Sequence, residues 1–279
     1  MNPAVLRIAA FCDGNTGGNP AGVVIAESHP GEADMRRIAA ETGYSETAFA
    51  MPLGDAFRVR YFSPESEVPF CGHATIALGA ALALEYGNGV FDLQLNEARI
   101  TVEGSCENGN MSAALQSPAT RSEAMPAELL EEVLALFGYS STDLDPALAP
   151  ARVHGGADHF AISLNSRSRL AAMQYDLDAG RELMRREGLI TILLAWAETP
   201  RLFHTRNPFA SGGVYEDPAT GTATAAFAGY LRDIGWPHAG SIEIHQGEDM
   251  GAPSRLYAEI PPEPGSSIRV SGRARIVED

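Results

Sequence analysis

GGVYEDPATGTATAAFAGYL, residues 212–231, joins an acidic turn, a glycine-bearing loop and a long run of small apolar residues. An earlier stretch, SEVPFCGHATIALGAALAL at residues 66–84, has the same layout, with an acidic residue and a proline before a short turn. When residues 71–75 (CGHAT) are set over residues 220–224 (TGTAT), three of the five positions are identical. The two copies indicate a duplicated chain with two similar halves, each of which presents one helix N-terminus.

The apolar runs inside both stretches predict buried helices. In residues 75–84 and in residues 222–231, apolar side chains go round every face of a helix instead of forming one stripe. A helix that is apolar on all sides is covered on all sides. Each half also contains many short strand-like segments. We therefore expect an α+β chain of two pseudo-symmetric lobes, in which each lobe is a curled, mostly antiparallel sheet around one central helix.

A change of composition marks the boundary between the two lobes. Residues 118–130 are polar, contain two prolines and then become helical, which is typical of a segment between domains. We place the N-terminal lobe at residues 1–117 and the C-terminal lobe at residues 118–266. The C-terminal strand, at about residues 267–279, can return to the first lobe.

Composition places the chain among cytoplasmic globular proteins. Hydrophobic residues make up 45% of the 279 positions, yet no apolar run approaches the roughly 20 residues that cross a bilayer. Residues 1–14 lack a basic segment and a long apolar core, so we expect no signal peptide there. The three cysteines show no paired spacing, which favours a reducing cytoplasm over a disulfide scaffold.

The acidic charge balance restricts the class of partner. The chain has 36 acidic and 20 basic residues and a formal net charge of -16. Nucleic acid and anionic membranes are disfavoured as partners, because Lys and Arg drive phosphate binding. A small anionic substrate stays possible, because backbone N–H groups at a helix N-terminus can hold it whatever the net charge.

Two acidic residues are candidates for proton transfer. Glu46 lies in YSETAF at the start of an expected strand, where its alternative is a solvated surface residue. Asp217 precedes Pro218, and its alternative is to cap the following helix. The residues alone leave both alternatives open.

The two helix N-termini carry the other candidates. His73 lies where a helix dipole favours the neutral imidazole, which suits proton transfer, although a packing histidine fits the sequence equally well. Cys71 lies where a thiolate is stabilised, with an inert buried cysteine as the alternative. Thr220 and Thr222 occupy the matching end of the second half. Neither threonine can act as a strong base, so the second end favours binding.

Several other classes of site lack their sequence signature. The seven histidines and three cysteines show no His-Glu-x-x-His or paired-cysteine spacing, and the closest cluster is His154 with His159. We expect no metal site. A hydrolase elbow, Gly-x-Ser-x-Gly, and a nicotinamide loop, Gly-x-Gly-x-x-Gly, are also missing from the sequence.

These motifs together resemble the PhzF-like proteins, the phenazine-biosynthesis isomerase family, which share the diaminopimelate epimerase fold. The resemblance runs along nearly the whole chain, and any one motif is less specific than the ordered set. The matching segments are residues 18–21 (GNPA), 45–47 (SET), 60–64 (RYFSP), 67–75 (EVPFCGHAT), 213–223 (GVYEDPATGTA), 246–247 (QG) and 253–254 (PS).

The resemblance implies an active site between two lobes, no cofactor or metal, and often a homodimer. It also implies acid–base chemistry at a carbon next to a carboxylate or conjugated acid. On this reading Glu46 is the catalytic acid/base, and His73 and Asp217 are its partners. Thr222 stands where the phenazine enzyme carries a serine. The substrate-binding positions are Cys71, Gly72, Thr220, Gly221 and Thr222.

One departure from the related epimerases decides between mechanisms. Cys71 stands where those enzymes place a catalytic cysteine, but Thr220 takes the matching place in the second half, so a two-cysteine mechanism is lost. We therefore predict a cofactor-independent isomerase that acts on a small carboxylate held by backbone amides, with Glu46 moving a proton between carbons. The alternatives are a racemase or epimerase that uses Cys71 with Glu46, a lyase, and a non-catalytic ligand-binding protein on the same fold.

Overall fold

The computed structural model describes residues 3–96 and 98–278, and it divides into two compact units. Unit 1 comprises Met1–Gln116 with Ser271–Asp279, and unit 2 comprises Ser117–Val270. The outermost limits of the lobes expected from the sequence, at residues 1–2 and 279, lie outside the described residues. The expected lobes at 1–117 and 118–266, with a returning strand at 267–279, stay a proposal about domains, and each unit is described below by itself.

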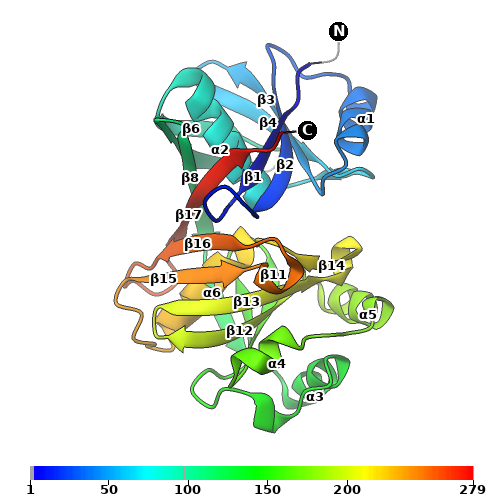
Figure 1. Cartoon of the computed structure of the whole chain (residues 1–279), viewed down its shortest axis with the longest axis vertical. Helices are drawn as coiled ribbons and strands as arrows, with labels where there is room; N and C mark the ends of the chain where they lie inside the picture. Colours follow the sequence, from blue (N-terminus) through cyan, green and yellow to red (C-terminus); the bar gives the residue numbers. More distant parts are fainter. Residues whose placement is uncertain (1–2, 97, 279) are drawn as a thin grey trace. The chain divides into compact units, whose positions relative to one another are not determined.

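Unit 1 is a curved sheet with one helix inside it and one helix outside it (Figure 1). Its strands pair antiparallel except where β2 runs parallel to β3 and β4 runs parallel to β6. The outer helix α1 packs on β3 and β4. The elements are β1 (Leu6–Ala10), β2 (Asn19–Ile25), α1 (Glu32–Thr42), β3 (Thr47–Leu53), β4 (Ala56–Phe62), β5 (Glu67–Val68), α2 (Gly72–Tyr86), β6 (Gly89–Gln94), β7 (Arg99–Glu107) and β8 (Asn110–Ala119).

The inner helix α2 is buried because its side chains are small. It packs against β1, β2, β3, β6 and β7, and residues 72–83 are all buried. Gly104 of β7 lies so close to α2 that a Cβ atom there would stand 2.1 Å from the carbonyl oxygen of Gly79. Backbone of the sheet and backbone of the helix therefore touch, which only glycine allows at this position.

Unit 2 repeats this plan around helix α6. The pairs β11–β12 and β13–β15 are parallel, and the other paired strands of the unit are antiparallel. Helix α6 packs on β9, β10, β11 and β16. The elements are β9 (Arg121–Ala124), α3 (Ala127–Leu136), η1 (Ser141–Asp143), β10 (Ala151–His154), β11 (Asp158–Ser163), α4 (Arg167–Ala171), α5 (Leu177–Glu187), β12 (Thr191–Thr199), β13 (Leu202–Phe209), η2 (Ala210–Gly212), β14 (Val214–Asp217), α6 (Gly221–Asp233), β15 (Ser241–Gln246), η3 (Glu248–Met250) and β16 (Ser254–Glu259).

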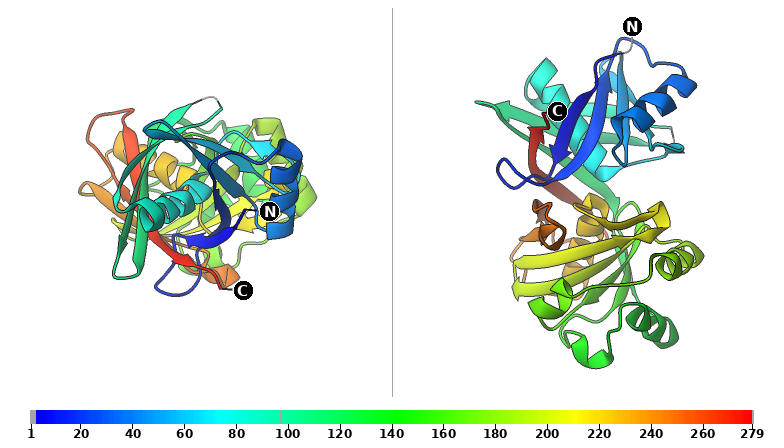
Figure 2. Two further views of the ribbon diagram at one scale, coloured as in Figure 1. Left: turned by 90° about the horizontal axis from the view of Figure 1, so that it is seen from above. Right: turned by 45° about the vertical axis from the view of Figure 1, so that its right-hand side comes forward.

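The second face of this sheet has its own core. Helices α3, α4 and α5 cover it, and Leu134, Leu170 and Met184 pack with Phe160 of β11 and Leu194 of β12 in one buried cluster. Figure 2 shows these helices outside the strands that surround α6. Unit 2 is thus a three-layer arrangement in which α6 is the most enclosed element.

The last strand, β17 (Ser267–Ile276), begins in unit 2 and ends in unit 1. Its second part pairs antiparallel with β1, and Ile8 faces Ile276. Figure 1 shows the first and last strands, blue and red, side by side. The expectation of an α+β fold with two curled sheets, each around a central helix, is confirmed. Among the described helices, none has both the length and the apolar character needed to cross a membrane.

Candidate functional site

Three candidate residues meet at the N-terminus of α2 in unit 1. Glu46 lies directly before β3, and Cys71 is the N-cap residue of α2. The His73 Nε2 atom is 3.4 Å from the Glu46 Oε2 atom, and the Cys71 Sγ atom is 3.4 Å from His73 Nδ1. The Glu46 and His73 side chains are only 12% and 8% exposed. The imidazole therefore lies between a carboxylate and a thiol, in a site that is largely shielded from water.

The surrounding backbone holds this cluster in place. The Gly22 N–H donates to the Glu46 carbonyl oxygen over 3.1 Å, and the Ser45 hydroxyl lies 3.4 Å from His73 Nε2. On the other side, the Thr75 hydroxyl donates to the Cys71 carbonyl oxygen and accepts from the Tyr61 hydroxyl, each over 2.7 Å. Burial raises the pKa of Tyr61 well above its ordinary value, so this hydroxyl keeps its proton. The first turn of α2 is thereby fixed.

The same turn offers backbone donors. The first hydrogen bond of the helix runs from the Thr75 N–H to the Cys71 carbonyl oxygen. The N–H groups of Gly72, His73 and Ala74 precede that bond and so have no partner within the helix. With the positive end of the helix dipole, they can receive a carboxylate beside Glu46.

Unit 2 brings together its own set of candidates at the N-terminus of α6. Thr220 is the N-cap residue, and its hydroxyl donates to the Asp217 Oδ2 atom over 2.6 Å. Asp217 ends β14 and is 8% exposed. Gly221 and Thr222 open the helix, with Gly221 buried and Thr222 half-buried. Asp217 is therefore not the N-cap itself, and its carboxylate acts on the cap through a side-chain hydrogen bond.

Gln246 is a further residue of this site, to which the sequence motifs assign no role. Its amide nitrogen donates to the Asp217 carbonyl oxygen over 2.7 Å and to the Thr220 hydroxyl over 3.0 Å. Its amide oxygen accepts from the Thr220 N–H over 3.2 Å. One buried side chain thus fixes the turn that carries Asp217 to the helix.

A buried ion pair next to Asp217 was missed as well. Arg206 Nε donates to Glu216 Oε1 over 2.9 Å, and Arg206 Nη2 contacts Glu216 Oε2. Arg206 Nη1 also donates to the Ala171 carbonyl oxygen over 2.9 Å. The sequence repeat gives a signal for Glu216, because this residue stands at the position that Glu67 takes in the first copy.

The histidine pair that the sequence singled out does not form a cluster. His159 is fully buried and its Nδ1 atom contacts the Thr191 hydroxyl, whereas His154 Nδ1 contacts the Asp158 carboxylate. Within residues 3–96 and 98–278, two other groups each bring three potential ligand atoms within 4.8 Å of one another. They are Glu46 with Cys71 and His73, and His204 with His245 and Glu248.

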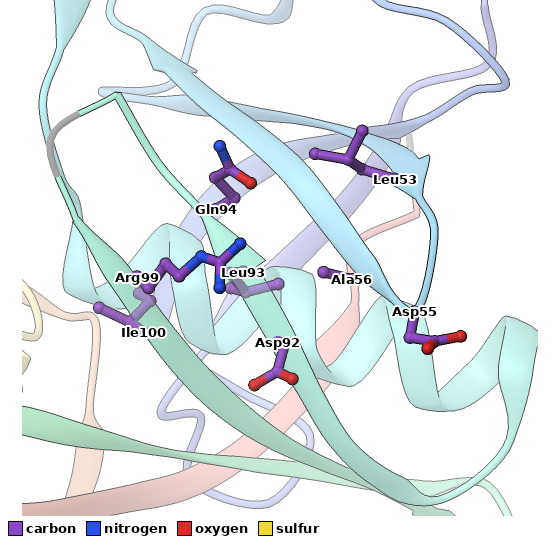
Figure 3. A pocket seen from close by; sticks show the side chains of 8 residues that line it. All are labelled: Leu53, Asp55, Ala56, Asp92, Leu93, Gln94, Arg99 and Ile100. Atoms are coloured by element: carbon purple, nitrogen blue, oxygen red, sulfur yellow. The ribbon is translucent and has the colours of Figure 1, made fainter.

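A separate hollow opens over neighbouring strands of unit 1 (Figure 3). It is lined by Leu53, Asp55, Ala56, Asp92, Leu93, Gln94, Arg99 and Ile100. The described lining residues come from β3, β4, β6, β7 and the turn between β3 and β4, and none belongs to the motifs discussed above. This hollow is therefore not part of the candidate site.

Comparisons with known proteins support a single family. The sequence profile of the phenazine biosynthesis-like protein family matches residues 8–279. A trans-2,3-dihydro-3-hydroxyanthranilate isomerase of Pseudomonas aeruginosa is 31% identical over 95% of this chain and 94% of its own length. An uncharacterised isomerase of Deinococcus radiodurans is 30% identical over 91% of this chain and 85% of its own length.

A solved structure has the same fold. The phenazine biosynthesis protein of Bacillus anthracis, from the PhzF family, superposes with a TM-score of 0.86. The alignment covers 100% of this chain and 98% of that one, at 23% sequence identity. The expectations of the family and of its diaminopimelate epimerase-like fold are confirmed.

Proposed function

Because the chain is an isomerase that belongs to the phenazine biosynthesis-like protein family, we propose that it moves a proton between carbon atoms of a small carboxylate substrate, without a cofactor. The observation that carries the proposal is the position of the Glu46 carboxylate beside the first turn of α2. A base and a set of carboxylate-binding N–H groups lie next to each other there.

In the proposed reaction Glu46 takes a proton from a carbon next to the substrate carboxylate. The electron pair left on that carbon spreads into the conjugated acid, whose developing negative charge the N–H groups of Gly72 and His73 stabilise. Glu46, now protonated, returns the same proton to a second carbon on the same face. No proton is gained or lost overall, and the product is an isomer of the substrate.

His73 and Asp217 act as partners in this proposal. The His73 imidazole, 3.4 Å from Glu46, orients the carboxylate and keeps solvent from its inner side. Asp217 is fixed by Thr220 and Gln246, and we assign it a role in orienting polar groups of the substrate. As the family resemblance implies, Cys71, Gly72, Thr220, Gly221 and Thr222 are proposed as substrate-binding residues.

Solvent-hydrogen exchange tests the proposal. The protein is incubated in D₂O with trans-2,3-dihydro-3-hydroxyanthranilate, proline and diaminopimelate, and substrate masses are followed with time. We expect isomerisation of one compound, with little deuterium in the product because Glu46 returns the same proton, and a fall in turnover of roughly 10²–10⁴-fold in Glu46→Gln. Glu41→Gln, an exposed glutamate on α1, is the matched control and should keep full activity. Full turnover by Glu46→Gln would contradict the assignment.

A racemase or epimerase is the second candidate, because the Cys71 thiol lies within the cluster, 3.4 Å from His73 Nδ1. In that reaction Cys71 with Glu46 would remove a proton from one carbon and return a proton to it, and the product would have the mirror configuration at that centre. Cys71→Ser would then abolish turnover. The isomerase proposal expects Cys71→Ser to stay active, so this one variant separates the two reactions.

We also propose a homodimer in the cytoplasm. The three cysteines are thiols and not disulfides, as is usual in a reducing compartment, and the family resemblance implies the dimer. Light scattering of the purified protein measures the mass directly, and a value near 29.6 kDa would contradict the dimer.

A further inference from the structure

Two histidines and a glutamate converge at the surface of unit 2, on three separate segments. His204 on β13 and His245 on β15 are register partners on adjacent parallel strands, with ring centroids 5.2 Å apart. Glu248 follows in the short turn η3. The His204, His245 and Glu248 side chains are 12%, 18% and 28% exposed. The cluster is therefore mostly buried, although solvent still reaches part of it.

Each imidazole is held from behind by a carboxylate. His204 Nε2 is 2.7 Å from Glu198 Oε2, and His245 Nε2 is 2.8 Å from Glu243 Oε1. A carboxylate accepts hydrogen bonds, so each Nε2 atom is a donor, and the neutral ring then carries its lone pair on Nδ1. This is how carboxylates orient the histidine ligands of a metal ion.

Both Nδ1 atoms face the same carboxylate. His204 Nδ1 is 3.0 Å from Glu248 Oε2, and His245 Nδ1 is 3.7 Å from Glu248 Oε1. In a tetrahedron with metal–ligand bonds of about 2.0–2.1 Å, neighbouring ligand atoms are about 3.3–3.4 Å apart. The two observed separations, which are measured to different oxygens of the same carboxylate, lie on either side of that value. A proton on Nδ1 or a bound cation can lie between each imidazole and the carboxylate, and the three potential ligand atoms lie within 4.8 Å of one another.

The charges around the cluster suit a divalent ion. The charged side chains there are Glu198, Glu243, Glu248, Asp249, Arg167 and Arg255. Four carboxylates against two guanidinium groups leave two negative charges when both imidazoles are neutral. Arg255 Nη2 contacts Glu248 Oε1 over 3.1 Å, whereas Glu248 Oε2 faces His204 and has Arg167 Nη2 at 3.7 Å.

We propose that His204, His245 and Glu248 bind one Zn²⁺ ion through the two Nδ1 atoms and a carboxylate oxygen, with water as the fourth ligand. Two imidazoles and a carboxylate suit zinc better than Mg²⁺ or Ca²⁺, which prefer all-oxygen sites. The ion joins β13, β15 and η3. Gln246, which holds Asp217 and Thr220, lies between two of the ligands in the chain, so the ion stabilises that turn from outside the proposed catalytic cluster.

Calorimetric titration of the full-length protein after chelator treatment tests the site. We expect one equivalent of Zn²⁺ to bind and to raise the melting temperature, and millimolar Mg²⁺ to do neither. His204→Gln and His245→Gln should lose this binding, whereas His238→Gln, a histidine outside the cluster, should retain it. Circular dichroism checks that each variant is folded.

Two further variants keep the test sharp. Glu198→Gln changes an exposed residue that contacts the ligand His204 and is not itself a proposed ligand. This variant should weaken Zn²⁺ binding roughly 10–100-fold. Cys71→Ser should still bind one equivalent of Zn²⁺. Zinc binding that survives in His204→Gln and His245→Gln but disappears in Cys71→Ser would place the ion at the Glu46 cluster and overturn the proposal. Absence of zinc binding in the unaltered protein would also overturn it.

Discussion

Arg206 and Glu216 form a forked ion pair, and Arg60 and Glu67 repeat it in the other unit. Arg206 Nε donates to Glu216 Oε1 over 2.9 Å, and Arg60 Nε donates to Glu67 Oε1 over 2.8 Å, with a second contact from Nη2 to Oε2 in each pair. In both units the arginine lies on a long strand and the glutamate on a short one before the central helix. The pair therefore fixes the turn that delivers the helix N-terminus.

The two pairs differ in burial, so their loss should differ in cost. The Glu216 side chain is 3% exposed, whereas Glu67 is 23% exposed. Glu216→Ala leaves an arginine buried without its charge partner and should lower the free energy of unfolding by about 3–5 kcal/mol. Glu67→Ala, in the more solvated pair, should cost about 1 kcal/mol. Urea unfolding of both variants measures the difference, and equal losses would contradict the role of burial.

A methyl group added at Gly104 should disturb the packing of α2 against its sheet. In Gly104→Ala the new Cβ atom would stand 2.1 Å from the Gly79 carbonyl oxygen, so the helix or β7 must move. We expect the free energy of unfolding to fall by about 1–3 kcal/mol. Gly89 is the register partner of Gly104 on β6, and a Cβ atom there meets open space. Gly89→Ala is thus the matched control and should leave stability nearly unchanged.

His73 should affect the rate more than substrate binding. Its ring contacts the Glu46 carboxylate and the Cys71 thiol, so His73→Asn leaves the proposed base without its neighbour. We expect kcat to fall by roughly 10²-fold with a smaller change in KM. His154→Asn, on the other unit and paired with Asp158, serves as the control in the same assay. A rise in KM alone would move His73 from catalysis to substrate binding.

Acid should destabilise the protein through His159. Burial lowers the pKa of His159 to about 3, against an ordinary value of 6.5. The unfolded chain therefore binds one more proton than the folded chain between these values. His159 contributes its full stability above about pH 6.5, and that contribution is lost as the pH falls toward 3, by up to about 1.4 kcal/mol per pH unit. His159→Phe should flatten this part of the curve in urea unfolding from pH 7 to pH 4. An unchanged slope would show that another group titrates there.

The sequence predicted what depends on local pattern. The two central helices follow from runs of small apolar residues. Cys71 and His73 lie two residues apart, so their meeting at one helix end needs no knowledge of the fold. Only the family resemblance predicts that Glu46 acts with these residues, because no spacing rule links a loop before β3 to the start of α2.

The remaining contacts depend on pairings that no local pattern encodes. Gln246 reaches Thr220 because β15 lies beside β13, which in turn pairs with β14. The same β13–β15 pairing sets His204 beside His245, although the two are far apart in the chain. A search for closely spaced metal ligands cannot find such a pair. The sequence predicts a turn where strand β14 lies, because four residues are too few to display alternation.

Strand β17 has a consequence for how the protein is made. Residues 271–276 complete unit 1 beside β1, and they follow every residue of unit 2 along the chain. Until then β1 has one unpaired edge, which is a known risk for aggregation. Unit 2 ends at Val270, so all of its residues are available for folding before the last strand of unit 1 is. This holds although unit 2 is encoded later than most of unit 1. The order of completion in the cell is thus the reverse of the order of the halves along the gene.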